Sequence, residues 1–256
     1  MKLMFLGTAA ADFSKRLLTD CKDRFDKDAR RASCLLIGEH YLVDCGPHAI
    51  DSLKIAGADI CAITDLFLTH LHSDHFSPEN IEEIAAAKKD PLRIWVRQDA
   101  ILPEIPNTET IRMPFQTLMS IADGITVETV DANHDQEFYP QHFIFTVNGK
   151  QLLYALDGGW FLNGSYKYLH NRNIDMAVLD ATCGDYAGDY RAGEHNSIPM
   201  IRLLVPSLKT WGAINDSTRI YLSHLAPRLH KPHEETQAIV EKDGLIVAYD
   251  GLATEL

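Results

Sequence analysis

The 256-residue sequence predicts a fold in which β-strands alternate with helices, either an α/β protein or helices packed outside β-sheets. Short apolar runs bounded by turn residues recur along the chain, and several are followed by stretches with helix start and stop signals. The composition, with 46% hydrophobic and 23% charged residues, is that of an ordinary globular protein. The length allows one large domain or two small ones.

Each expected strand is a short apolar run that ends at a turn or loop signal. Glu39-His40 separates two such runs and suggests a hairpin, and Asn148-Gly149 between two others is a strong hairpin signal. The expected strands are residues 2–7, 34–38, 41–45, 65–69, 92–96, 125–130, 142–147, 151–156, 176–179, 219–222 and 245–248.

Helices are expected where a capping residue or proline precedes a run of helix formers. Pro47 stands near the start of one helix and Gly57 just past its end, while Ser77 caps another that has Pro78 at its first position. The expected helices are residues 47–56, 78–87, 196–205 and 234–241. The charged stretch 11–32 has no clear structure and is either a functional loop or an insertion of no consequence.

The net charge and the cysteines exclude several classes of protein. A formal net charge of −12 makes the chain a poor platform for non-specific binding to nucleic acid. The five cysteines are odd in number and form no C-x-x-C pair, which argues against a disulfide framework or a four-cysteine zinc site. The N-terminal apolar run is too short for a signal peptide, and no run is long enough to span a membrane, so we expect a cytoplasmic protein.

The segment from Thr69 to His75 carries the strongest chemical signal. His70, His72, Asp74 and His75 fall within six residues, directly after an apolar strand. Imidazole nitrogens and carboxylate oxygens are ligands that zinc and similar divalent ions prefer. His70 and His72 can point one way while Asp74 and His75 turn toward a second ion. The segment therefore predicts a metal site.

This H-x-H-x-D-H pattern resembles the signature of the metallo-β-lactamase superfamily. Further landmarks follow in the expected order, since residues 42–46 resemble the strand motif before the signature, and His134, Asp157 and His224 resemble the later ligands. The resemblance implies an α+β fold, a four-layer αββα sandwich formed by one domain over residues 1–256. It also implies two divalent metal ions, with zinc expected and manganese or iron as alternatives.

The resemblance assigns the ligands to two ions. The first would be held by His70, His72 and His134, the second by Asp74, His75 and His224, with Asp157 and a water or hydroxide bridging both. Taken singly, three of these have simpler interpretations: His134 as a solvated loop residue, Asp157 as a turn aspartate, and His224 as a buried core histidine. Asp44 either orients a ligand histidine or caps a turn.

A second pattern bears on the substrate. Asp180-Ala181-Thr182 followed by His195-Asn196-Ser197 resembles the D/E-x-T and H-x-S pattern of the phosphodiesterase branch, which includes the tRNA-maturation endonuclease and a phosphoribosyl cyclic phosphate phosphodiesterase. Carried over, His195 would stabilise developing charge or protonate the leaving group, and Asp180 would orient it. The simpler interpretation makes His195 the first residue of a helix. Arg31 could contact a phosphate, although a solvated surface charge is the favoured interpretation.

Two departures from that branch limit the expected substrate. Residues 11–32 contain only Cys21, so a structural zinc there is not expected, and no long basic or glycine-rich arm is visible. We expect a dimetal hydrolase that cleaves a small phosphate ester, cyclic or open, through a metal-bridging hydroxide, with Asp74, His195 and Asp180 as catalytic candidates. We expect no long nucleic acid and no membrane as a partner, and the oligomeric state stays open. The alternatives are hydrolysis of a lactone, lactam or thioester, or a non-catalytic binding module.

Overall fold

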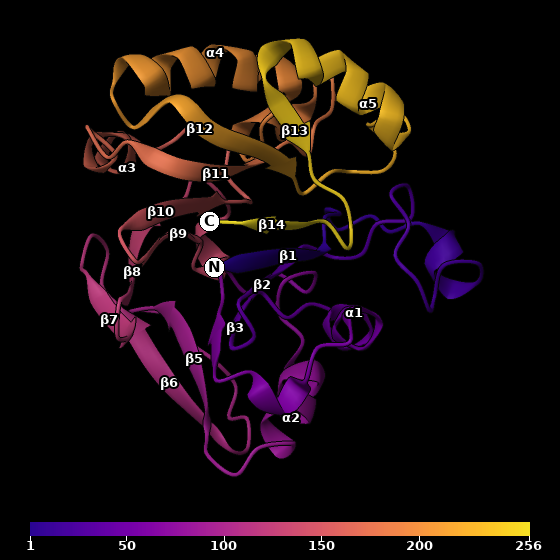
Figure 1. The fold of residues 1–256 in the computed structure, drawn as a ribbon, viewed down its shortest axis with the longest axis vertical. Coiled ribbons are helices and arrows are strands. Elements are labelled where there is room, and N and C mark those ends of the chain that lie inside the picture. The colour runs from indigo at the N-terminus through magenta and orange to yellow at the C-terminus, as the bar shows by residue number, and fades with distance from the viewer.

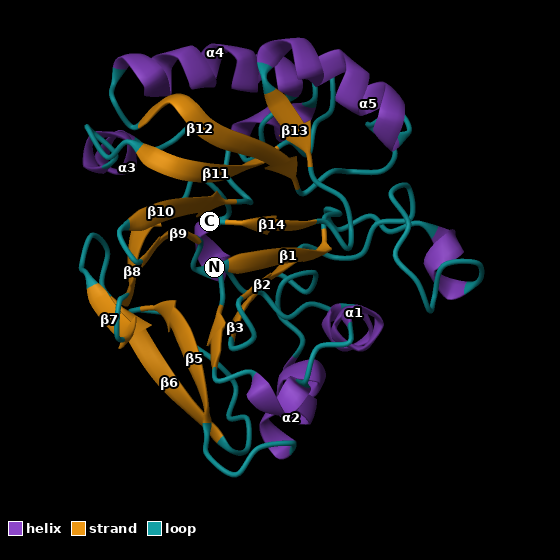
Figure 2. Cartoon of the chain, in the orientation of Figure 1, coloured by secondary structure: helices purple, strands orange, loops and turns teal.

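The computed structural model describes residues 1–256 as two seven-stranded sheets with five α-helices on the outside (Figure 1). Helices α3, α4 and α5 lie over one sheet, and α1 and α2 lie beside the other. Figure 2 shows the resulting order of layers, with helices outermost and strands between them. The expected α+β architecture, a four-layer αββα sandwich, is confirmed.

The two sheets share the same pattern of antiparallel and parallel strand pairing. Each has antiparallel strands on one side and parallel strands on the other, in the orders β14-β1-β2-β3-β4-β5-β6 and β7-β8-β9-β10-β11-β12-β13. The first sheet contains β1 (Lys2–Gly7), β2 (Cys34–Ile37), β3 (Tyr41–Val43), β4 (Asp65–Phe67), β5 (Leu92–Arg97), β6 (Thr108–Met113) and β14 (Ala253–Glu255). The second contains β7 (Met119–Ala122), β8 (Ile125–Asp131), β9 (Gln141–Val147), β10 (Lys150–Ala155), β11 (Ile174–Asp180), β12 (Ile214–Ser223) and β13 (Leu245–Val247).

Alternation of side chains along the strands produces three separate cores. On β9, Phe143 and Phe145 point into the core between the sheets, while Ile144 points to the core beneath the helices of the second sheet. On β2, Leu35 and Leu36 divide in the same way between the central core and the core beneath α1 and α2. Both faces of both sheets are therefore buried, as the continuous apolar runs in the sequence require.

The helix signals locate four of the five α-helices, all but α3. The ranges are α1 (Ala49–Ala56), α2 (Pro78–Ala86), α3 (Asn163–Tyr168), α4 (Ile198–Thr210) and α5 (His233–Val240). Gly57 adopts a left-handed conformation and ends α1, and the Ser77 hydroxyl accepts a hydrogen bond from Asn80 N at the start of α2. The structure also shows that none of these helices combines the length and the apolarity that a membrane span needs.

Several expectations about single elements are wrong. Strands β6, β7 and β14 and helix α3 were not expected, because β6 is a largely polar edge strand and the other three elements are short. Residues 245–248 are not the last strand, since β14 follows and pairs with β1. Helix α4 continues past Pro206 to Thr210, although proline normally ends a helix. Leu208, which lies after the proline, is buried in the core between α4 and the second sheet.

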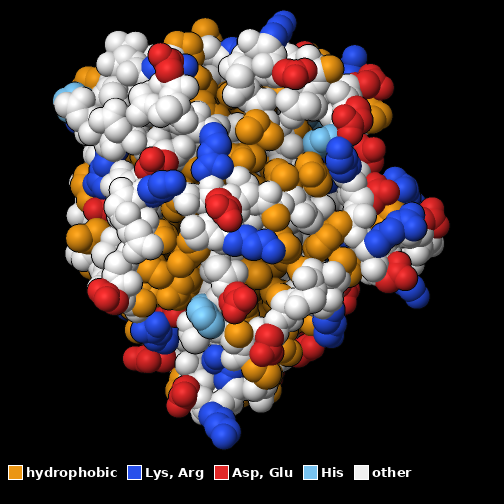
Figure 3. Space-filling view, in the orientation of Figure 1, with side chains coloured by type: hydrophobic (Ala, Val, Ile, Leu, Met, Phe, Trp, Pro, Cys, Tyr) orange, Lys and Arg blue, Asp and Glu red, His pale blue; other side chains and the backbone are white.

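The stretch 11–32 projects from the body of the molecule and contains only a 3-10 helix, Lys15–Leu18 (Figure 1). In Figure 3 the projection at the right edge shows basic and acidic side chains intermixed. The interpretation of Arg31 as a surface or phosphate-binding charge is wrong, because its side chain is only 2% exposed. Its guanidinium donates to the carbonyl oxygens of Cys21 and Arg24 and lies 4.0 Å from the Asp250 carboxylate, so it anchors the base of this projection.

Phe67 is a sensitive point of the central core. It ends β4, is fully buried, stacks on Trp95 at a centroid distance of 5.4 Å, and meets Phe145 of the opposite sheet edge-on at 5.0 Å. Phe67→Ala is expected to lower the free energy of unfolding by about 3–5 kcal/mol, because it leaves a cavity between the sheets. Denaturant unfolding measures this, and Ile101→Ala at an exposed site should change it by less than about 0.5 kcal/mol. Equal stability of the two variants would contradict the assignment of Phe67 to the central core.

Candidate metal centre

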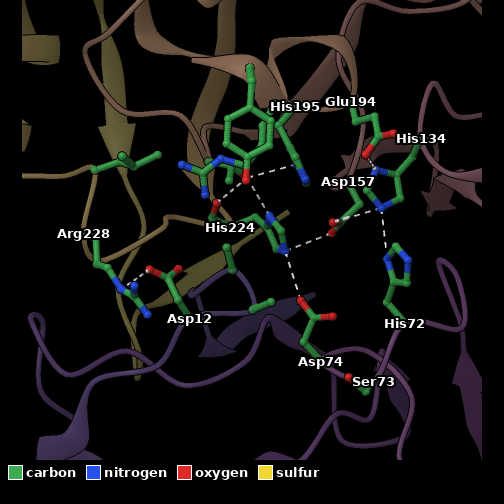
Figure 4. A pocket seen from close by; sticks show the side chains of 16 residues that line it. Asp12, His72, Ser73, Asp74, His134, Asp157, Glu194, His195, His224 and Arg228 are labelled. Atoms are coloured by element: carbon green, nitrogen blue, oxygen red, sulfur yellow. Dashed lines mark hydrogen bonds and ion pairs between the residues drawn. The ribbon is translucent and has the colours of Figure 1, made fainter.

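All seven expected ligands gather at one edge of the sandwich, where strands of both sheets end. Figure 4 labels His72, Asp74, His134, Asp157 and His224 among them. The segment 70–75 follows β4 of the first sheet, and the other three follow β8, β10 and β12 of the second. This convergence explains why residues far apart in the sequence form one cluster, since the carboxyl ends of parallel strands meet at a common edge. The cluster consists of His70, His72, Asp74, His75, His134, Asp157 and His224.

Three residues of this edge have left-handed backbones within two residues of the end of a strand. The φ angles are 63° at Asp44, 51° at Asp157 and 57° at His224. Such angles are uncommon outside glycine and turn the chain sharply, which aims each side chain back toward the cluster. Gly46 permits a further close approach, since a Cβ there would lie 1.8 Å from the Asp74 carbonyl oxygen.

The first ligand set is compact. His70 Nε2 lies 2.9 Å from His72 Nδ1, and His134 Nε2 lies 3.1 Å from the same Nδ1. Two ligands bound at about 2.1 Å to one ion with an angle of about 90–110° lie about 3.0–3.4 Å apart. The spacing of these three nitrogens therefore fits a single divalent ion.

The second set lies beside the first and shares Asp157 with it. His75 Nε2 and His224 Nε2 are 3.2 Å apart, and Asp74 Oδ2 lies 3.4 Å and 3.5 Å from them. Asp157 Oδ2 faces this set at 2.9 Å from His75 Nε2, whereas Asp157 Oδ1 faces the first set at 3.7 Å from His134 Nε2. The two oxygens of one carboxylate thus address two separate groups of ligands.

The donor chemistry fits two divalent ions. Asp157 Oδ2 is buried and accepts no hydrogen bond, although two imidazole nitrogens lie close to it. Asp44, Asp74 and Asp157 are at most 7% exposed, and buried carboxylates need compensating positive charge. This oxygen lies 2.9 Å and 3.1 Å from two imidazole nitrogens that can also act as metal ligands, so its position fits a cation site.

The pKa values of the cluster are set by burial and by the charges of neighbouring side chains. Burial alone would raise the pKa of Asp157, but the charges of His224 and His75 outweigh it and hold this pKa well below its usual range. Burial would likewise lower the pKa of His224, yet Asp157 and Asp180 raise it to about 10. Burial dominates at His70 and lowers its pKa well below the usual value.

Asp44 orients His75, one of the expected ligands, through a hydrogen bond. It is fully buried, and its Oδ2 accepts a hydrogen bond from His75 Nδ1 at 2.8 Å, while its Oδ1 accepts from Thr69 N at 2.8 Å. Burial raises the pKa of Asp44, and the contacts with His75 and Thr69 oppose this rise. The hydrogen bond fixes the His75 ring so that Nε2 points into the cluster.

Asp44→Asn is expected to weaken binding of one metal ion by about 10- to 100-fold, because His75 loses its anionic acceptor. Asparagine tolerates the left-handed backbone at this position, so the change isolates the hydrogen bond from the fold. Titration of the metal-free protein with Zn²⁺ against a chromophoric chelator measures the effect. The ion held by His70, His72 and His134 should bind as before, and unchanged binding of both ions would contradict the role of Asp44.

His195 and Asp180 also lie at the cluster. His195 Nδ1 donates to Asp180 Oδ2 at 2.9 Å, and the His195 ring meets the His134 ring at a centroid distance of 5.0 Å. Burial would lower the pKa of His195, but Asp180 raises it. His195 is placed just before α4, which begins at Ile198, so it is not a residue of that helix.

Thr182 was missed as a functional residue by the sequence reasoning, although it stands in the quoted D/E-x-T pattern. Its Oγ1 lies 2.7 Å from His224 Nδ1, donates to Asp180 Oδ2 at 3.0 Å, and lies 3.2 Å from His195 Nδ1. One hydroxyl thus links the expected ligand His224 to two catalytic candidates, Asp180 and His195. The third position of the pattern, two residues after Asp180 at the end of a strand, was the available signal.

The cluster lies in an open cavity of about 780 Å³. Its wall includes residues that sequence reasoning did not select, among them Arg191 and Glu194 from the segment before His195. On the other side, Arg228 Nε lies 3.4 Å from Asp12 Oδ2 (Figure 4). Asp12 comes from the start of the 11–32 stretch, which therefore contributes to the cavity wall.

Sequence comparisons give partial matches. Residues 1–91 match the family model described as Anti-Pycsar protein Apyc1. The chain is 30% identical over 98 residues to ribonuclease Z of Methanothermobacter thermautotrophicus, which covers 37% of this chain and 29% of that one. It is 26% identical over 160 residues to ribonuclease Z of Methanococcus maripaludis, covering 61% and 45%. The chain thus spans less than half the length of each of these relatives.

Structural comparisons cover the whole chain. A diphosphatase of the PhnP family aligns with a TM-score of 0.75 at 18% identity, covering 100% of this chain and 97% of the other. The metallo-β-lactamase fold protein YhfI from Bacillus subtilis aligns with a TM-score of 0.74 at 15% identity, covering 100% and 99%. The chain therefore has the metallo-β-lactamase fold, which confirms the resemblance drawn from the H-x-H-x-D-H pattern at the level of the fold.

Proposed function

We propose that this protein is a two-metal hydrolase that cleaves a small phosphodiester. The observation that carries the proposal is Asp157, whose two oxygens face two separate ligand sets on the floor of a cavity that also holds His195. When bound, two such ions lower the pKa of a water toward 7 and stabilise the charge of an in-line displacement. Zinc is our first choice for both, because the donors are nitrogen and oxygen.

The residues of the site would have two roles, metal binding and proton transfer. His70, His72 and His134 would hold one ion, Asp74, His75 and His224 the other, and Asp157 both. His195 lines the cavity and can donate a proton to a leaving oxygen, while its Nδ1 remains hydrogen-bonded to Asp180. Because Asp180 fixes one ring nitrogen, the other nitrogen is directed away from it and is free to meet a substrate.

Three observations favour a phosphodiester of limited size. The relatives with partial matches are named ribonuclease Z, and a structural neighbour is named a diphosphatase. A cavity of about 780 Å³ suits a small molecule better than a folded polymer. The net charge of −12 disfavours a long polyanion, whereas two dications would make the cavity locally positive. We accordingly propose a small-molecule substrate.

The proposal is tested by loading the purified protein with Zn²⁺ or Mn²⁺ and assaying bis-p-nitrophenyl phosphate together with cyclic nucleotides and cyclic ribosyl phosphates. Two bound ions per chain and turnover of at least one phosphodiester are expected. Protein with two bound ions and no turnover across this panel would reject the phosphodiester. Turnover of a lactone or thioester that His195→Ala leaves unchanged would assign a different hydrolase.

A further inference from the structure

The ring of His134 differs from the other buried histidines of the cluster. In His75 and His224 the nitrogen that points away from the ligand set meets Asp44 at 2.8 Å and Thr182 at 2.7 Å, respectively. In His70 that nitrogen lies 3.1 Å from Thr69 Oγ1. His134 Nδ1 is buried and has no hydrogen-bond partner. A histidine that binds a metal through Nε2 carries a proton on Nδ1, and this proton needs an acceptor.

Glu194 is the residue placed to supply that acceptor. Its Oε2 lies 3.9 Å from His134 Nδ1, and Figure 4 shows its carboxylate beside the His134 ring. The Glu194 side chain is 56% exposed, so a small rotation can bring the oxygen within hydrogen-bond distance without disturbing a core. The other carboxylate near the ring, Asp157, lies 3.7 Å from Nε2 and belongs to the ligand set.

The backbone holds the two segments together. Asn133 Nδ2 donates to the Gly193 carbonyl oxygen at 3.2 Å, so a hydrogen bond connects the residue before His134 to the residue before Glu194. A Cβ on Gly159 would lie 3.1 Å from that same carbonyl oxygen, which shows how closely a third segment packs here. Glu194 N in turn donates to Arg191 O, so the position of Glu194 is fixed by its backbone and only its side chain is free.

We propose that Glu194 is a positioning residue that orients His134 for metal binding and thereby links the 190–195 wall of the cavity to the metal centre. This inference rests on the proposed two-metal function. The carboxylate acts on His134, not directly on an ion.

The test measures Zn²⁺ affinity by competition with a chromophoric chelator, in metal-free wild-type protein and three variants. Glu194→Ala is expected to weaken the ion held by the first ligand set by about 10- to 100-fold. Glu194→Gln keeps an oxygen that can accept from Nδ1 and should recover part of this loss. Glu82→Ala, at an exposed acidic residue of α2, is the matched control and should bind as the wild type does.

The outcomes separate this inference from the proposed function. Wild-type protein that binds no Zn²⁺ would refute the two-metal function itself. Two ions bound by the wild type and by Glu194→Ala with equal affinity would refute the role of Glu194 and leave the two-metal function standing. Equal losses in Glu194→Ala and Glu194→Gln would show that Glu194 acts through its charge alone and would overturn the proposed contact.

Discussion

Asp157→Asn is expected to remove hydrolysis and to reduce the bound metal from two ions to one or none. Asp157 is the one side chain whose oxygens face both ligand sets, at 2.9 Å from His75 Nε2 and 3.7 Å from His134 Nε2. An asparagine of the same size offers one oxygen and a nitrogen that cannot bind a cation. The rate should fall by more than about 10⁴-fold, because water without two-metal activation is a far weaker nucleophile at neutral pH.

Metal content per chain and the rate on bis-p-nitrophenyl phosphate measure this effect together. Asparagine keeps the volume of aspartate and tolerates the left-handed backbone, so the variant should fold, and circular dichroism confirms this. His72→Ala provides an independent check, since it removes the nitrogen shared by the short contacts of the first set. A variant of Asp157 with two ions and a normal rate would contradict the assignment.

The sequence could predict the cluster because its ligands follow apolar strands. The H-x-H-x-D-H segment comes directly after β4, and the remaining ligands follow strands whose hydrophobic runs were recognised. Strand ends of one sandwich edge must lie near one another, so the order of the landmarks implied their proximity. The hairpins around Glu39 and Asn148 are confirmed for the same reason, since turn signals and apolar runs act over short distances.

What the sequence could not predict depends on contacts between distant segments. Arg31 was interpreted as a surface charge because nothing nearby in the sequence reveals that its guanidinium meets carbonyl oxygens and lies near Asp250. Glu194 Oε2 comes within 3.9 Å of His134 Nδ1 because backbone packing brings together segments 60 residues apart in the sequence. Edge strand β6 escaped detection because its alternation is mostly polar and only Met113 is fully buried.

The shared pairing pattern of the two sheets places two carboxylates of the site at equivalent positions. Strand β3 of the first sheet and β10 of the second occupy equivalent places, each the last antiparallel strand before the parallel ones. Asp44 follows β3 and Asp157 follows soon after β10, both with left-handed backbones. Both carboxylates contact His75, on Nδ1 and near Nε2, so this one ring is held between equivalent positions of the two sheets.

His195→Ala is expected to lower the hydrolysis rate by about 10²–10⁴-fold while both ions stay bound, because the change removes a proton donor and no expected ligand. His195 lies in the cavity wall, and its Nδ1 donates a hydrogen bond to Asp180. The centroid of its ring lies 5.0 Å from that of His134. Stopped assays at saturating substrate, with metal analysis of the same sample, measure both quantities. Loss of an ion in this variant would make His195 a ligand instead.

Asp180→Asn tests whether Asp180 supports both catalysis and metal binding, because its carboxylate lies beside His195 and beside the expected ligand His224. Its Oδ2 lies 2.9 Å from His195 Nδ1 and 3.3 Å from His224 Nδ1, and it accepts from Thr182 Oγ1 at 3.0 Å. Replacing it should lower the rate as His195→Ala does and should also weaken the ion of the second set by about 10-fold or more. If the two variants instead show the same metal affinity, Asp180 orients His195 alone, and Thr182 is sufficient to hold the His224 ring.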